Sequence, residues 1–217
     1  MKKILLINAC ARPESRTYRL AQYVLEQLKP AGGKEGPETG EGIQPGAEKT
    51  WPEAEAEKIE VEEVKLYEEK QLLPLDKERL EERNSCIAAG DFSPDLFRYA
   101  RQFAEADEII IAAPYWDLLF PAVLRTYFEM VTVTGVTFYY TPEGIPKGLC
   151  KASRILYVMT AGGPVGDYNF GFDYVKALAH TFYGIPETIC VKAENLDVVG
   201  ADPEKILQET MDTVTLG

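Results

Sequence analysis

A cysteine, two arginines and two hydroxyl side chains lie close together near the start of the chain. Residues 8–17 read Asn-Ala-Cys-Ala-Arg-Pro-Glu-Ser-Arg-Thr, and the side chains that could bind an anion are Cys10, Arg12, Ser15, Arg16 and Thr17. The stretch connects a short apolar run to a pattern with the period of an amphipathic helix. The first N–H groups of a helix and the positive end of its dipole attract anions. The stretch therefore predicts a phosphate-binding loop, with helix capping as the simplest alternative role for Ser15.

Two later segments place unusual residues directly after predicted strands. Residues 113–121 read Ala-Pro-Tyr-Trp-Asp-Leu-Leu-Phe-Pro, where an ordinary loop would be polar. A planar aromatic ligand would explain this composition, because side chains can cover its face while backbone N–H groups meet its polar edge; a dimer contact is the alternative. Residues 160–166 read Thr-Ala-Gly-Gly-Pro-Val-Gly; adjacent glycines let the backbone approach a ligand closely, although they also suit a plain turn. The candidate binding residues of these loops are Pro114, Tyr115, Trp116, Asp117, Leu118, Thr160, Ala161, Gly162 and Gly163.

The elements that must position these loops alternate along the chain. Strands are expected at residues 2–9, 58–66, 108–113, 154–160 and 187–193, and helices at 15–29, 76–89, 94–106, 120–131, 172–183 and 203–214, with a short extended segment or hairpin at 136–141. This alternation predicts a three-layer α/β/α fold around a parallel sheet. Five strands match the flavodoxin-like order 2-1-3-4-5, in which ligands bind beyond the carboxyl ends of the strands, at the switch point between the first and third strands. All three loops would meet there.

Length and composition narrow the class of protein. A chain of 217 residues suits a single domain, interrupted at residues 30–57 by a Gly/Pro/Glu-rich insertion that we expect to be flexible. The formal net charge of -12 argues against nucleic acid as a partner, because phosphate backbones favour basic proteins. No apolar run approaches the roughly 20 residues that a membrane helix needs. Four scattered cysteines and a single histidine argue against disulfides and metal sites and favour a reducing cytoplasm.

With these loops identified, the chain resembles the FMN-dependent NAD(P)H oxidoreductases typified by azoreductases and the related NAD(P)H quinone dehydrogenases. The likeness covers nearly the whole chain outside the insertion and is strongest from residue 112 to 163. The matching segments are APYWDLLFP at 113–121, LRTYF at 124–128, GVTF at 135–138, GIPKGL at 144–149 and TAGG at 160–163. They correspond to the family's APMYNFxxP loop, its K-x-Y-x-D helix, its GxTF segment, its G-x-G-L turn and its S-R-G-G loop.

The resemblance implies a role for each loop. Ser15, Arg16 and Thr17 match the stretch that holds the FMN phosphate, residues 115–118 match those against the isoalloxazine ring, and residues 160–163 match the loop beside it. Cys10, Asp117 and Ala161 stand where the family has Ser, Asn and Arg. The resemblance also implies a homodimer with the flavin at the interface and ping-pong chemistry. NADH or NADPH would deliver hydride to flavin N5, and a quinone, azo compound or similar small-molecule acceptor would take the electrons. No catalytic side chain is expected, because the cofactor supplies the chemistry.

Two alternatives stay open at this point. Cys10 to Thr17 also spells C-x5-R-T, the pattern of the low-molecular-weight tyrosine phosphatases, in which Cys10 would be the nucleophile, Arg16 the phosphate ligand and Asp202 the general acid. Pro13 and Glu14 within the loop argue against that reading, as does the aromatic 113–121 segment. The departures at Cys10, Asp117 and Ala161 leave room for a second alternative, a flavodoxin-like binding module without a cofactor.

Overall fold

The computed structural model describes residues 1–29 and 58–216, so the predicted insertion at 30–57 lies outside the described residues. Its central feature is a parallel sheet of five strands in the order β2-β1-β3-β6-β7. The strands are β1 (Lys2–Asn8), β2 (Ile59–Lys65), β3 (Glu108–Ala112), β6 (Arg154–Thr160) and β7 (Glu187–Ala193). The remaining two strands, β4 (Phe138–Tyr140) and β5 (Pro146–Gly148), form a separate antiparallel hairpin. Among the five sheet strands the predicted order 2-1-3-4-5 is confirmed.

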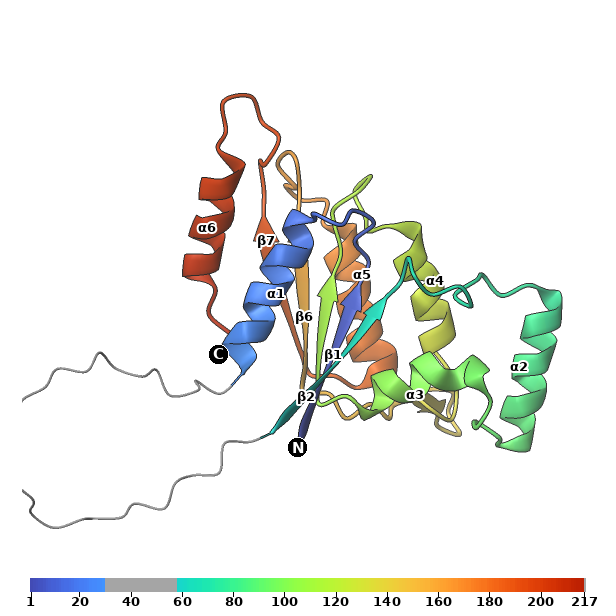
Figure 1. The fold of residues 1–217 in the computed structure, drawn as a ribbon. Helices are drawn as coiled ribbons and strands as arrows, with labels where there is room; N and C mark the ends of the chain where they lie inside the picture. Colours follow the sequence, from blue (N-terminus) through green and yellow to red (C-terminus); the bar gives the residue numbers. More distant parts are fainter. Residues whose placement is uncertain (30–57, 217) are drawn as a thin grey trace, which may run out of the picture.

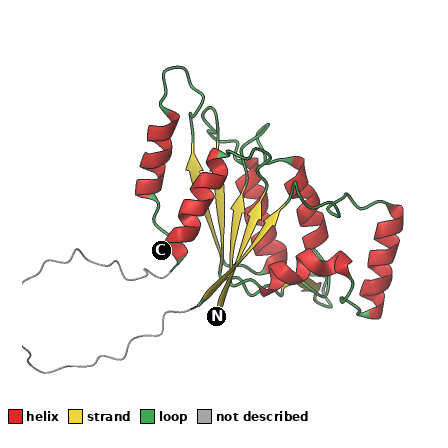
Figure 2. Cartoon of the chain, viewed as in Figure 1, coloured by secondary structure: helices red, strands yellow, loops and turns green. Residues whose placement is uncertain are grey.

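Helices cover both faces of the sheet, as a three-layer fold requires (Figures 1 and 2). The helices are α1 (Arg16–Leu28), α2 (Lys77–Ala89), α3 (Arg98–Glu105), α4 (Ala122–Val131), α5 (Phe170–Leu178) and α6 (Pro203–Thr213). Successive side chains of a strand point to opposite faces. Ile4 and Leu6 of β1 therefore pack in the core under α1 and α6, whereas Leu5 and Ile7 pack in the core under α3, α4 and α5. This burial on both faces explains the nearly unbroken apolar runs of the central strands.

Some predicted helix boundaries differ from the structure for reasons of long-range packing. The helix expected at 94–106 begins as a 3-10 turn, η1 (Asp95–Phe97), before α3. The helix expected at 172–183 begins at Phe170 and widens after Leu178 into a π turn, η2 (Ala179–Tyr183). Tyr183 is fully buried, and its carbonyl accepts the N–H of Cys150 just beyond the β5 strand at 3.3 Å. Contact with the hairpin therefore accompanies the change of helix type.

Helix α2 differs from the other helices in having no buried residue. Asp76 caps its first turn by accepting the Arg79 N–H at 2.9 Å, and Gly90 ends it in the left-handed region. Arg83 joins it to the carbonyls of Glu129 and Thr132 at the end of α4. None of the helices in the described ranges is long and apolar enough to cross a membrane.

Candidate functional site

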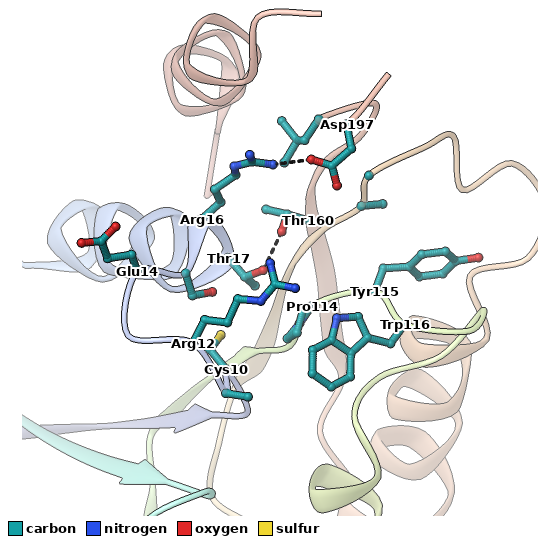
Figure 3. Close-up of a pocket in the computed structure, with 15 residues that line it drawn as sticks. Cys10, Arg12, Glu14, Arg16, Thr17, Pro114, Tyr115, Trp116, Thr160 and Asp197 are labelled. Atoms are coloured by element: carbon teal, nitrogen blue, oxygen red, sulfur yellow. Dashed lines mark hydrogen bonds and ion pairs between the residues drawn. The ribbon is translucent and has the colours of Figure 1, made fainter. Parts of the chain in front are cut away.

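A pocket of about 270 Å³ opens beyond the carboxyl ends of the sheet strands, where the switch-point rule places a ligand (Figure 3). It brings together three predicted loops that are far apart in the sequence. The predicted residues that line it are Cys10, Arg12, Ser15, Arg16, Thr17, Pro114, Tyr115, Trp116, Thr160, Ala161 and Gly162. Asp117, Leu118 and Gly163 belong to the same loops but are not part of its lining.

The first loop presents the start of α1 to the pocket. Ser15 caps the helix, because its Oγ accepts the Tyr18 N–H at 3.3 Å. Within the described residues, the N–H groups of Arg16 and Thr17 have no acceptor, as expected for the first turn of a helix. Thr17 is buried, and its hydroxyl shares a 2.6 Å hydrogen bond with the hydroxyl of Thr160 at the end of β6. Ser15 is therefore both a helix cap and part of an anion-binding geometry.

Cys10 lies at the base of this loop in a neutral form. Burial raises the pKa of its thiol from 9.0 to about 11, and a hydrogen bond with Ser15 offsets this only in part. Its Sγ lies 3.7 Å from the Ala112 carbonyl oxygen. The low pKa that the phosphatase alternative requires is wrong for this chain, because desolvation of the thiol outweighs the hydrogen bond with Ser15 and the nearby Glu63 carboxylate raises the pKa further.

The aromatic loop makes a tight turn against the end of β6. The Tyr115 N–H donates to the Thr160 carbonyl at 3.0 Å, and the Tyr115 hydroxyl donates to the Tyr168 carbonyl at 2.9 Å. Trp116 and Leu119 exchange backbone hydrogen bonds of 3.0 and 2.8 Å across two residues with positive φ, Asp117 at 50° and Leu118 at 69°.

A leucine in this conformation costs about 1–2 kcal/mol, and such strain concentrates at functional sites. Asp117 and Leu118 form the exposed tip of the turn, whereas Trp116 stays on the pocket wall while 41% exposed.

A fourth loop, which the sequence reasoning missed, completes the pocket. Leu196 and Asp197 follow β7 and line the wall opposite the aromatic loop. Their N–H groups donate to the carbonyls of Ala161 and Gly162 at 3.2 and 2.8 Å, and the Asp197 carboxylate accepts from Arg16 at 2.9 Å. The parallel topology could have indicated this loop, because the carboxyl end of β7 lies at the same edge of the sheet as the carboxyl ends of β1, β3 and β6. Ala11 and Glu14 of the first loop also line the pocket and were not predicted.

Metal-ligand chemistry has no counterpart in this geometry. No group of three His, Cys, Asp or Glu side chains gathers as a metal site in the part of the chain that the structure describes. All four cysteines are free. His180, the single histidine, is exposed on η2, away from the pocket lining.

The chain has clear relatives of known type. A profile of the flavodoxin-like fold family matches residues 47–215. The FMN-dependent NADH:quinone oxidoreductase of Lachnoclostridium phytofermentans is 35% identical over 96% of this chain and 94% of its own length. FMN-dependent NADH:quinone oxidoreductase 2 of Clostridium acetobutylicum is 34% identical over 98% of this chain and 96% of its own. The chain belongs to this oxidoreductase family.

Solved structures agree on the fold. An azoreductase from Bacillus anthracis superposes with a TM-score of 0.72 at 24% identity, covering 98% of this chain and 96% of its own. The names of these relatives confirm the predicted family, the oxidoreductase class and FMN as cofactor. The sequence left the donor open between NADH and NADPH, and the relatives are named for NADH.

Proposed function

We propose that this chain binds FMN in the four-loop pocket and acts as an NADH-dependent reductase of quinones, azo compounds or similar small acceptors. The observation that supports this most directly is the meeting of two features in one pocket. At one side lie hydroxyl groups and helix N–H groups that have no acceptor among the described residues, and both suit a phosphate. Tyr115 and Trp116, which suit a planar ring, lie at the other.

The residues of the first loop would hold the phosphate. The N–H groups of Arg16 and Thr17 supply donors at the positive end of α1. Of the paired hydroxyls of Thr17 and Thr160, the one that accepts in their shared hydrogen bond keeps its own proton to donate. Arg12 lines the pocket and supplies positive charge. Cys10 closes the base of the loop as an uncharged thiol, which does not repel an anion.

The second and third loops would bind the ring. Trp116 offers an exposed aromatic face, and Tyr115 is fixed by hydrogen bonds at both its N–H and its hydroxyl. Gly162 lies against the Asp197 carboxylate: a Cβ there would come 2.5 Å from Asp197 Oδ2, and that carboxylate would have to move. Pro114, Thr160 and Ala161 complete this side of the pocket. Asp117, Leu118 and Gly163 are proposed as contacts of a ligand that extends beyond the pocket wall.

When bound, FMN would supply hydride acceptance at N5 and two-electron delivery to the acceptor in a ping-pong sequence. The protein's own residues bind and orient the reactants and shield them from water. We assign none of them an acid–base role, and product protonation is left to solvent. The relatives favour NADH as donor over NADPH.

We further propose a homodimer with the flavin at the interface, working in a reducing cytoplasm. Beside the pocket, apolar side chains are exposed on the aromatic turn and on the segment that leads into α5. A second copy of the chain would cover them. Four free cysteines fit a compartment that keeps thiols reduced.

An absorbance spectrum tests the proposal. The purified protein is incubated with FMN and desalted, and we expect retained bands near about 375 and about 450 nm, as for oxidised flavin. Under nitrogen, NADH should bleach the bands and a quinone should restore them. Protein that retains no FMN would refute the proposal and favour the cofactor-free binding module; retained bands that NADH cannot bleach would refute the reductase activity alone.

A further inference from the structure

The two arginines of the phosphate loop differ in their surroundings. Arg16 Nη1 lies 2.9 Å from Asp197 Oδ1, and Figure 3 shows the Arg16 side chain directed to that carboxylate. Arg12 makes no ion pair with any residue that the structure describes, and it lines the pocket. The Arg12 guanidinium is thus available to an anionic ligand, whereas the charge of Arg16 is already opposed by the Asp197 carboxylate.

The backbone of Asp197 is fixed at the pocket wall, whereas its side chain is 69% exposed. Its N–H donates to the Gly162 carbonyl at 2.8 Å. Its second carboxylate oxygen, Oδ2, lies directly over Gly162, where a Cβ would come within 2.5 Å. The carboxylate therefore lies between Arg16 and the glycine loop, on the wall that an anionic ligand would face.

The charges of the pocket lining cancel. Its charged side chains are two arginines and two carboxylates, Arg12, Arg16, Glu14 and Asp197. Arginine side chains form some of the strongest hydrogen bonds to phosphate, and in this lining they are matched by as many carboxylates. Here most of the attraction must come from main-chain N–H groups, hydroxyls and Arg12.

Asp197 also differs from the neighbouring acidic residue of the same surface. Glu204 of α6 pairs with Arg19 through contacts of 2.9 and 2.7 Å. This second pair joins α1 to α6, whereas Arg16 of α1 pairs with the loop after β7. Both are partly exposed arginine–carboxylate pairs, and only the Arg16–Asp197 pair lines the pocket.

We infer that Asp197 sets the affinity and selectivity of the pocket for the cofactor phosphate by withholding Arg16 from it. The inference rests on the proposed function, since it assumes that the anion is the phosphate of FMN. In this inference Asp197 weakens phosphate binding, and it does so through its ion pair with Arg16. Removing the carboxylate charge frees the guanidinium and removes a like charge from the pocket wall.

Dissociation constants for FMN and for riboflavin, which lacks the phosphate, test this inference by quenching of flavin fluorescence. We expect Asp197→Asn to tighten FMN binding about three- to tenfold, a modest gain because the Arg16–Asp197 pair is partly exposed. Riboflavin binding should not change. Arg16→Gln alone should weaken FMN binding, because it leaves the Asp197 carboxylate unopposed beside the phosphate. The double variant Asp197→Asn with Arg16→Gln should bind FMN less tightly than Asp197→Asn alone.

Glu204→Gln is the control for removing an acidic charge that lies near Arg16 but does not pair with it. Because Glu204 pairs with Arg19 outside the pocket, this variant should change the FMN constant by clearly less than Asp197→Asn. Asp197→Ser serves as a second neutral variant, and circular dichroism with thermal unfolding of the flavin-free proteins checks the fold. Three results would overturn the inference alone, with FMN binding by the wild type intact. They are no gain in FMN affinity in either Asp197 variant, weaker FMN binding by these variants, or an equal gain in riboflavin affinity. Absence of FMN binding in every protein would overturn it together with the proposed function.

Discussion

At Cys10 two effects act on one thiol in opposite directions. Burial disfavours the thiolate, whereas a hydrogen bond with Ser15 favours it, and burial dominates in raising the pKa to about 11. A phosphatase needs the thiolate at neutral pH. The other two residues that the phosphatase alternative needs already have partners. Arg16 binds Asp197, and Asp202 caps α6 by accepting the N–H groups of Glu204 and Lys205. The phosphatase alternative therefore has no support in the structure.

The raised pKa of Cys10 makes folding stability fall at alkaline pH. Below about pH 9 both the folded and the unfolded chain carry the protonated thiol, so this group contributes no pH dependence. Between about pH 9 and the folded pKa of about 11 the unfolded chain loses the proton first, and stability is lost as pH rises. We expect the free energy of unfolding of the wild type, relative to Cys10→Ser, to fall by about 2 kcal/mol across this window.

Urea unfolding of both proteins at several pH values measures this difference. Serine is a suitable replacement because it cannot titrate in the window and is close in size. Cys150 and Cys190 also have raised pKa values, of about 12 and about 11, and both variants retain them, so their contribution cancels in the comparison. Parallel stability curves for the two proteins would show that the Cys10 thiol does not titrate differently in the folded state.

At the scale of elements, the β4–β5 hairpin and η2 depend on one close approach. A Cβ on Gly148 would collide with the backbone of Tyr183 and Gly184. We expect Gly148→Ala to destabilise the fold by about 3 kcal/mol, because backbone on both sides must shift. Gly144→Ala in the same hairpin is the control: its Cβ would meet open space, and only its φ of +78° is unfavourable, at a cost of about 1 kcal/mol.

Chemical denaturation without flavin gives both values. An equal loss in the free energy of unfolding for the two variants would mean that the hairpin can move away from η2 at little energetic cost. The dependence of η2 on the close approach of the hairpin would then be wrong.

The same elements show what the sequence can predict and what it cannot. Strand β3 could be identified because Glu-Ile-Ile-Ile-Ala is buried on both faces, which leaves an apolar run. The three predicted loops followed from such strands and the switch-point rule. The π turn could not be predicted, because it forms where Gly148 packs on Tyr183 from a distant part of the chain. The Arg16–Asp197 pair spans 181 positions, and no local pattern indicates it.

At the scale of the whole molecule, the pocket lies beside an uncovered apolar surface. Tyr168 and Phe170 are 57% and 47% exposed, with ring centroids 5.8 Å apart. The Tyr168 carbonyl accepts the Tyr115 hydroxyl, which connects this surface to the pocket wall. Trp116 and Leu118 of the aromatic turn are exposed as well. A ligand ring at Trp116 would add to this surface, so ligand binding and association of two copies would reinforce each other.

We therefore expect sedimentation equilibrium to give about twice the chain mass of 24.3 kDa and FMN to strengthen the association. Replacing both Tyr168 and Phe170 with Glu should yield monomers, because two copies would then oppose like charges at an apolar contact. The fold should tolerate the change, since both side chains are exposed and a carboxylate suits the first turn of α5. Leu73→Glu, at a residue 55% exposed elsewhere, is the control and should stay dimeric. A monomeric wild type, or a double variant that still dimerises, would place the interface elsewhere or remove it, and the pocket would then have to bind FMN within one chain.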